Sequence, residues 1–327
     1  MFELRRWGRT AALLSAGLIL SAGSLVLPAA GAAADAPQDR TAAGADRDRG
    51  HHGPHKAGGN GWDKEKKRTV DYVALGDSYA AGFGGGEVLD ACGRTAEGYP
   101  ALLDALPRVE LDADVTCGGA TASITPPAPP AGPVDLPEQI AALQAAGSID
   151  RNTDLVTLTI GGNDVRFTEV VAACAGAALP ATCEPALAAA QAYAETTLAP
   201  QVRGSLQQLR ALAPRAELVL VGYPHLFDEA GVPGLLTAEA AGLFNAGTDA
   251  LNAVLAAQLP DRRSTYVDVV DEFAGHGVGS ADPWIIFGAP AANLHPNATG
   301  YREGYLAAIT AGVELHPGGG QPCRGRR

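Results

Sequence analysis

Five short apolar segments, separated by longer helical patterns, constrain the fold of this 327-residue chain more than any other feature of its sequence. Each is rich in β-branched residues or leucine and is bounded by Gly, Pro, Asp or Asn, which is typical of strands. Three are nearly continuous apolar runs, as expected of a parallel sheet that is covered on both faces. The expected strands are residues 70–75, 109–115, 155–160, 217–221 and 265–270.

The segments between these strands have helical periodicity. Alternating strands and helices predict an α/β fold, a three-layer α/β/α sandwich around a central parallel sheet of about five strands. A last helix is expected after Asn297, which can cap it, and includes Tyr301, Tyr305 and Ile309. The other expected helices are residues 99–106, 136–146, 165–178, 185–212 and 235–258.

The first 34 residues have the pattern of a secretory signal peptide. Arg5, Arg6 and Arg9 precede an apolar run over about residues 10–27, and Ala32 to Ala34 offer a small-residue cleavage site. A retained membrane anchor is the alternative, because the run approaches spanning length, but its glycines and serines favour cleavage. The paired arginines leave general secretory and twin-arginine export open. We expect a secreted, extracellular protein without a stable membrane anchor.

Residues 35–68 and 317–327 are polar and lack apolar periodicity, so they cannot bury enough surface to offset the entropy of ordering. We expect a disordered linker and a flexible tail. The linker contains His51, His52 and His55. These histidines could bind a metal loosely, but a solvated segment is the better interpretation, and we expect no metal site and no cofactor. The remaining 248 residues, 69–316, suit one α/β domain.

The predicted domain is strongly acidic. Residues 69–316 contain 29 Asp and Glu but only 10 Arg, a formal balance of −19, whereas the whole chain carries −12. All four lysines lie upstream of this span. Such a surface repels phosphate backbones and anionic headgroups, so we exclude nucleic acid as a partner.

Five cysteines in an exported chain predict disulfides. Cys92 and Cys117 enclose 24 residues, and Cys174 and Cys183 enclose eight. Sequential pairing of these four is the arrangement that we choose among the possibilities, and it leaves Cys323 over. Buried free thiols are the alternative.

Polar residues follow the first three predicted strands, and a histidine precedes the last predicted helix. Ser78 lies three residues past the first strand, Gly119 follows the second, and Asn163 follows the third. Loops that leave the carboxyl ends of parallel strands converge on one crevice. A serine hydroxyl, a backbone N–H, an amide donor and the imidazole of His295 can therefore meet there. These are the parts that acyl transfer to a serine needs.

Each of these residues also has a simpler explanation. Gly-Asp-Ser is a common turn sequence, in which Ser78 could cap a helix. Gly119 could belong to an ordinary turn, and Asp164 can cap the next helix. His225 and His276 are the other candidate histidines, and a single histidine is more often structural than catalytic. Only the combination, in this order, indicates a catalytic site.

Together these motifs resemble the SGNH hydrolases, also called GDSL lipases and esterases. The family order Ser, Gly, Asn, His is matched at Ser78, Gly119, Asn163 and His295, over about residues 70–312. The resemblance is closest to the secreted bacterial lipase/esterase branch and implies a flavodoxin-like fold. It also implies that Ser78 is the nucleophile and His295 the base. The implied oxyanion hole consists of the Ser78 and Gly119 amides and the Asn163 side chain.

The chain departs from the family pattern before the histidine. Many members have an aspartate three residues before it, where this chain has Ala292. Some secreted relatives use a main-chain carbonyl instead, so we expect the carbonyl of Asn293 or Ala292 to orient His295. Asp282 is the rival, because it could fold back to take the role of the acid.

The resemblance also bears on the cysteines. The branch has a disulfide just after the serine motif and a short one after the asparagine motif, as Cys92–Cys117 and Cys174–Cys183 would be here. Its third disulfide has no obvious counterpart, because Cys323 stands alone.

The leading hypothesis is a monomeric extracellular carboxylic-ester hydrolase that acts on a small-molecule or lipid ester. A carbohydrate O-deacetylase is the alternative within the fold. Trp284 is the only tryptophan of the domain, which argues mildly against stacking on sugars. A non-catalytic binding module predicts no turnover, and the intact set of Ser, Asn and His disfavours it.

Overall fold

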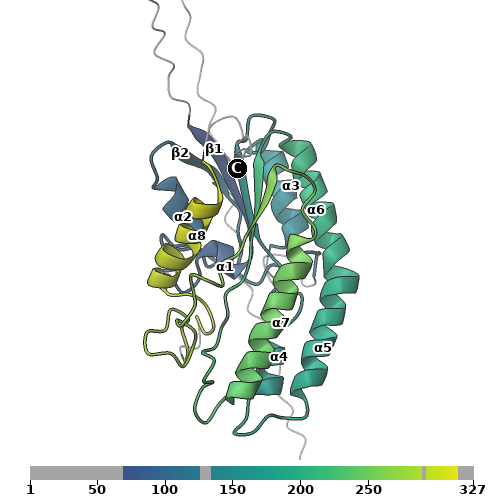
Figure 1. Cartoon of the computed structure of the whole chain (residues 1–327). Coiled ribbons are helices and arrows are strands. Elements are labelled where there is room, and N and C mark those ends of the chain that lie inside the picture. The colour runs from purple at the N-terminus through teal and green to yellow at the C-terminus, as the bar shows by residue number, and fades with distance from the viewer. Residues whose placement is uncertain (1–68, 126–133, 289–291, 316–327) are drawn as a thin grey trace, which may run out of the picture. The chain divides into compact units, whose positions relative to one another are not determined.

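The five predicted strands form one parallel sheet in a computed structural model of the chain (Figure 1). They are β1 (Val70–Gly76), β2 (Val109–Asp114), β3 (Leu155–Thr159), β4 (Glu217–Val221) and β5 (Ser264–Val267). The strand order is β2–β1–β3–β4–β5. This is the order of flavodoxin-like folds, which bind ligands at the carboxyl edge where the order reverses, between β1 and β3.

The structure describes residues 69–125, 134–288 and 292–315. The expected signal peptide, linker and tail, with Cys323, lie outside these residues.

The central strands are buried on both faces, and helices cover them. All five residues of β3 are buried, as are all but one of β1 and of β4, whereas the edge strands β2 and β5 are partly exposed. One face carries α2 and α8 and the other carries α3 and α6 (Figure 1). The predicted three-layer sandwich is therefore correct. These helices are α2 (Tyr99–Asp104), α3 (Leu136–Ala146), α6 (Ala199–Leu212) and α8 (Ala307–Gly312).

Three further helices pack on one another beside the carboxyl edge of the sheet. They are α4 (Phe167–Cys174), α5 (Cys183–Tyr193) and α7 (Ala238–Ala256). In Figure 1 they extend past the end of the sheet that is nearest to α1 (Ser78–Ala81). Both α4 and α7 are shorter at each end than the periodicity predicts.

The predicted helix over residues 185–212 is present as one unbroken stretch of helical backbone, and its helix type changes in the middle. This segment is the end of α5, a π-helical turn η1 (Ala194–Leu198) and then α6. Pro200 lies at the start of α6. Because proline has no N–H, and because its ring clashes with the carbonyl four residues earlier, the helix widens into a π turn at this point.

Two other boundaries follow from side-chain hydrogen bonds to the backbone. The carboxylate of Asp268 accepts from the N–H of Val270 (2.9 Å), which ends β5 earlier than predicted. The side chain of Asn297 accepts from the N–H of Gly300 (3.0 Å), as expected of a cap. The last helix begins there as π-helical η2 (Gly300–Leu306) and continues into α8.

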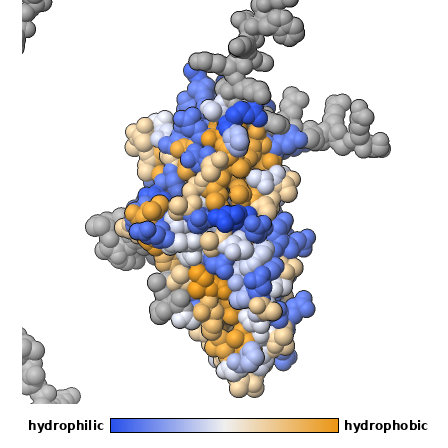
Figure 2. Space-filling view, turned by 90° about the vertical axis from the view of Figure 1, so that its left-hand side faces the viewer, coloured by the Kyte–Doolittle hydropathy of each residue, from blue (hydrophilic) through white to orange (hydrophobic). Residues whose placement is uncertain are grey.

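The surface mixes charged and apolar side chains. Figure 2 shows them interspersed on the face that lies at the left in Figure 1. Among the described residues, five large apolar side chains are exposed, and Leu89, Ile124 and Phe287 are three of them. They lie on the loops that follow β1 and β2 and on the loop that precedes His295. Within the described residues, no helix is long and apolar enough to cross a membrane.

Candidate active site

Ser78 lies at the carboxyl edge of the sheet, where the strand order reverses. It is the first residue of α1, and α1 begins two residues after Gly76, the last residue of β1. The N–H of Asp77 donates to the carbonyl of Thr159 at the end of β3 (2.9 Å), which ties this turn to the neighbouring strand. The carboxylate of Asp77 caps α1 by accepting from the N–H of Tyr79 (2.9 Å). Because Asp77 is the cap, the hydroxyl of Ser78 is left for another partner.

That partner is His295. Its Nε2 lies 2.7 Å from the Oγ of Ser78, although 217 residues separate the two. Its Nδ1 lies 2.9 Å from the carbonyl oxygen of Asn293. A carbonyl can only accept, so Nδ1 carries the proton and Nε2 is left to accept from the serine. The rings of Tyr79 and Phe83 flank the imidazole, at centroid distances of 5.0 and 5.2 Å.

The backbone next to His295 is held in an uncommon conformation. Leu294 has a φ of +62°, a left-handed conformation that costs a non-glycine residue about 1–3 kcal/mol. Its carbonyl accepts from the hydroxyl of Tyr79, and its N–H donates to the carbonyl of Ile286 (2.8 Å). The N–H of Ile286 in turn donates to the carbonyl of His295 (2.8 Å). These bonds fix the backbone from which the imidazole projects.

Gly84 lets a neighbouring loop approach the histidine closely. A Cβ on Gly84 would lie 2.7 Å from a backbone oxygen of Pro296 and 3.2 Å from the Cβ of His295. Its φ of +93° is also one that glycine adopts without strain. A larger residue would therefore push His295 away from its partner.

Asp282 lies beside a different histidine. Its carbonyl oxygen is 2.8 Å from the Nδ1 of His276, and its carboxylate is 3.5 Å from the same atom. The remaining candidate, His225, has its Nε2 2.7 Å from the carboxylate of Asp249. Neither histidine hydrogen-bonds the serine. Of the two groups considered for orienting His295, the backbone carbonyl is the one in contact with it.

The turn at Gly118 and Gly119 lies beside the serine. A Cβ on Gly118 would be 3.8 Å from that of Ser78, and Gly119 has a left-handed φ of +83°. The N–H groups of Ser78 and Gly119 make no hydrogen bond to other described residues. A disulfide between Cys92 and Cys117 joins this turn to the loop after α1, and the N–H of Gly118 donates to the carbonyl of Cys92 (2.7 Å). The N–H of Gly119 on this cross-linked turn and the N–H of Ser78 itself are therefore two donors near the serine hydroxyl.

Asn163 adds a side-chain donor on the turn after β3. Its Nδ2 donates to the carbonyl of Ala120 (2.9 Å), which fixes the amide beside the turn after β2. An amide nitrogen carries two N–H groups, so the second is left for a ligand. Asn163 and Ser78 line the same hollow.

Asp164 does not cap the next helix, contrary to the prediction. Its carboxylate accepts from the N–H of Ala122 (3.0 Å), and Arg166, which precedes α4, makes no side-chain cap. The reason is that the turn after β3 runs on for two more residues, which leaves Asp164 facing the loop after β2. It joins the turn that carries Asn163 to the turn that carries Gly119.

Tyr223 links the ends of β1 and β3, and sequence reasoning missed it. Its hydroxyl donates to the carboxylate of Asp77 (2.5 Å) and accepts from the N–H of Gly162 (2.9 Å). Burial raises the pKa of Asp77 to about 7, and the hydrogen bonds from Tyr223 and Tyr79 oppose this rise. A signal was available, because Tyr223 lies just past the end of β4, where residues of a parallel sheet face the same edge.

The electrostatic environment keeps His295 neutral at pH 7. Burial lowers its pKa below the ordinary value of 6.5, and hydrogen bonds to the backbone at Asn293 and Ala292 oppose the shift. No carboxylate among the described residues forms an ion pair with it. A neutral imidazole can accept a proton, which general-base catalysis requires.

The other predicted disulfide, Cys174–Cys183, is also present and joins the end of α4 to the start of α5. Within the described part of the chain, no group of three or more His, Cys, Asp or Glu is placed to hold a metal ion.

Comparison with known proteins places the chain among the serine ester hydrolases and identifies its family. Residues 74–303 match the GDSL-like Lipase/Acylhydrolase family. A lipase of Streptomyces rimosus is 32% identical over 250 residues, which cover 75% of this chain and 87% of the relative. Lipase 2 of Streptomyces coelicolor is 33% identical over 256 residues, which cover 72% of this chain and 83% of the relative. The chain therefore belongs to the GDSL-like lipase/acylhydrolase family.

Solved structures agree with this assignment. The extracellular lipase of Streptomyces rimosus superposes with a TM-score of 0.62 at 29% identity, covering 75% of this chain and all of that one. The structure of a phospholipase A1 from Streptomyces albidoflavus NA297 superposes with a TM-score of 0.61 at 31% identity, covering 74% of this chain and 98% of that one. The predicted flavodoxin-like SGNH hydrolase fold is confirmed.

Proposed function

We propose that this protein is a secreted carboxylic-ester hydrolase that works through an acyl-enzyme at Ser78. The observation that carries the proposal is the chain of contacts from the serine Oγ to the Nε2 of His295 and from its Nδ1 to the carbonyl of Asn293. His295 takes the hydroxyl proton as Oγ bonds to the ester carbonyl carbon, and the carbonyl electron pair moves onto its oxygen.

The donors beside the serine would stabilise that oxygen. The N–H groups of Ser78 and Gly119 and the second N–H of Asn163 form the proposed oxyanion hole. When the intermediate collapses, the bond to the alkoxy oxygen breaks and the imidazolium gives its proton to the leaving alcohol. Water then attacks the acyl-enzyme with His295 again as base, which releases the acid and regenerates Ser78.

The group that orients His295 is proposed to be the carbonyl of Asn293, in place of a triad carboxylate. A carbonyl fixes the tautomer as a carboxylate does, but it brings no full negative charge to stabilise the imidazolium. The orientation of the imidazole then depends more on its packing between Tyr79 and Phe83 and on the backbone conformation of Leu294.

Secretion is proposed with residues 1–34 as signal peptide, 35–68 as linker, 69–316 as catalytic domain and 317–327 as tail. Two disulfides support an oxidising destination, and the relative of solved structure is described as extracellular.

Fatty-acyl esters are the proposed substrates. The relatives are named lipases and a phospholipase A1. The exposed apolar side chains of Leu89, Ile124 and Phe287, on loops that lead to and from the site, also suit an apolar substrate better than a sugar.

The test is hydrolysis of p-nitrophenyl esters from acetate to palmitate by the wild type and by Ser78→Ala. Loss of the nucleophile should lower kcat about 10⁴- to 10⁶-fold on every ester. Ser148→Ala, a serine just after α3, is the matched control and should keep wild-type kcat. A Ser78→Ala enzyme that keeps more than about a tenth of its activity would contradict the mechanism. A wild type that cleaves only acetylated sugars would favour the deacetylase.

A further inference from the structure

The serine opens onto a hollow that leads away from the sheet. This hollow is lined by Ser78, Asn163 and Tyr223 at the sheet and by Phe167 of α4 and Phe244 of α7. Its far side is therefore made by helices that lie beside the sheet.

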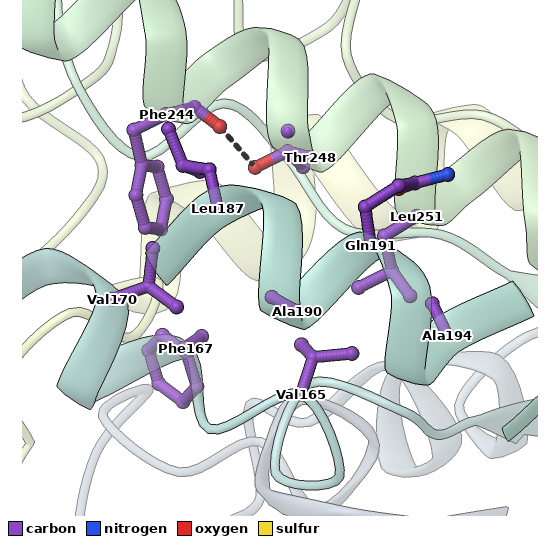
Figure 3. Close-up of a pocket in the computed structure, with 11 residues that line it drawn as sticks. Val165, Phe167, Val170, Leu187, Ala190, Gln191, Ala194, Phe244, Thr248 and Leu251 are labelled. Carbon is purple, nitrogen blue, oxygen red and sulfur yellow. Dashed lines mark hydrogen bonds between the residues drawn. The ribbon is translucent and has the colours of Figure 1, made fainter. Parts of the chain in front are cut away.

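A second hollow lies among α4, α5 and α7 (Figure 3). Four residues line both hollows, so the two are neighbours across these side chains. They are Phe167, Phe244, Thr248 and Leu251. On the other sides, the second hollow is bounded by Val170 of α4, by Leu187 and Ala190 of α5, and by Val165 before α4 (Figure 3).

The second hollow is apolar, and its two polar side chains have partners elsewhere. No charged residue lines it. The hydroxyl of Thr248 donates to the carbonyl of Phe244 in its own helix (3.3 Å), the bond dashed in Figure 3. The amide of Gln191 donates to the carboxylate of Glu195 (2.6 Å). A ligand in this space would contact mainly carbon surfaces, which favours an apolar ligand.

Asn163 also belongs to the wall of a third, wider groove. Its lining is mixed: it contains the charged side chains of Arg166 and Glu169 together with apolar ones, and Val165, Val170 and Ala190 line the second hollow as well. An ester has two arms, and this groove offers polar partners to an alcohol arm, whereas no charged residue lines the second hollow.

We propose that the second hollow, which we call the acyl hollow, binds the distal methylenes of the substrate's acyl chain. The chain runs from Ser78 past Phe167 and Phe244 into the space among α4, α5 and α7, while the alcohol arm faces the groove that contains Arg166 and Glu169. The ligand class is an unbranched carboxylic ester long enough to pass the two phenylalanines. This assignment rests on the proposed acyl-enzyme at Ser78.

Gly247 determines how much of the acyl hollow is open. It lies on α7 and lines the hollow, and a Cβ there would come 2.9 Å from the Cδ2 of Leu187 on α5. A larger side chain must therefore push Leu187 aside or occupy the hollow itself. Gly242 lies on the same helix, is exposed, and would place a Cβ more than 4 Å from any other group. The same helix therefore carries a test position and a control position: Gly247 faces the hollow, and Gly242 faces solvent.

The experiment compares kcat/KM for p-nitrophenyl butyrate and decanoate in the wild type, Gly247→Leu and Gly242→Leu. Each methylene that enters an apolar site is worth about fourfold in kcat/KM. Gly247→Leu should lower the decanoate-to-butyrate ratio at least about tenfold, because two or more methylenes lose their place. Gly242→Leu should keep the wild-type ratio. Ala190→Leu, which fills the hollow from α5, should repeat the effect of Gly247→Leu and serves if that variant does not fold.

The outcomes separate the two proposals. A wild type that hydrolyses neither ester contradicts the proposed function. The acyl hollow is overturned if the wild type hydrolyses both esters but folded Gly247→Leu and Ala190→Leu keep the wild-type ratio. It is also overturned if these variants lose activity on both esters equally. In both cases the mechanism at Ser78 still stands.

Discussion

The carboxyl edge of the sheet and the acyl hollow are neighbouring regions built in opposite ways. At the edge, turns after β1, β2 and β3 are tied by hydrogen bonds, among them those of Asp77, Asp164 and Tyr223. The hollow has apolar walls on three helices, and its polar side chains bond to their own helices. The first region holds reacting groups at fixed distances, whereas the second offers a surface without directional contacts.

This difference means that reaction rate and chain-length preference should be separable. Hydrogen bonds that form only in the transition state act on kcat, whatever the length of the substrate. Contacts with methylenes grow with chain length and act on kcat/KM for long esters. Substitutions at the edge should therefore shift all esters together, and substitutions in the hollow should shift their ratio.

The largest effect that sharpens this comparison is expected for Asn163→Ala. Losing one oxyanion donor should lower kcat about 10²- to 10³-fold, which corresponds to a rise of about 3–4 kcal/mol in the activation free energy. Steady-state kinetics on butyrate and decanoate should show the same loss on both, because the hollow is untouched. An unchanged kcat would make Asn163 a turn residue, and a loss confined to decanoate would break the distinction between the regions.

A smaller effect is expected for Asp282→Asn. Replacing a triad aspartate costs about 10⁴ in kcat, but Asp282 contacts His276 and not His295. We therefore expect a loss of less than about tenfold, well short of the triad figure. Asp249→Asn, beside His225, is the matched control. A kcat reduced by thousands would make Asp282 the third member of a triad.

The smallest expected effect is a shift of the acidic limb in the profile of kcat/KM against pH. His295 must be neutral to act as base, and burial lowers its pKa below 6.5. Activity should therefore persist as pH falls through 6.5 and be lost only below it, with kcat/KM at pH 6.5 above half of its plateau. Asp77, with a pKa of about 7, titrates nearby, so the profile of Asp77→Asn isolates the limb of His295. A limb centred above 6.5 in that variant contradicts the assignment.

Sequence reasoning located the strands well because their signal is local. Each expected strand overlaps an observed one, and Ser78, Gly119 and Asn163 follow β1, β2 and β3 as the pattern predicts. The rule that strand ends converge then accounts for their proximity. Errors arose where a local preference met a competing contact, as at Asp164, whose carboxylate bonds to the loop after β2 instead of capping α4.

The position of Tyr223 after β4 follows the same rule, but the acyl hollow and the hydrogen-bond partners of Tyr223 could not be found in this way. The bond from Tyr223 to Asp77 spans 146 residues, and its partner depends on how β1 and β4 sit in one sheet. The hollow depends on the spacing of α4, α5 and α7, which is set by how these helices pack on one another. Gly247 looks like any helical glycine in the sequence, and only the nearness of Leu187 gives it a role.

The central claim is that Ser78 carries the acyl group, and labelling with a p-nitrophenyl alkylphosphonate tests it most directly. The serine Oγ should displace p-nitrophenolate from phosphorus and form a stable Oγ–P bond. Intact mass spectrometry should show one phosphonyl group per chain, peptide mapping should find it on Ser78, and esterase activity should fall in proportion. Ser78→Ala should take up no label. Label on another residue, or full esterase activity in a protein labelled at Ser78, would contradict the account.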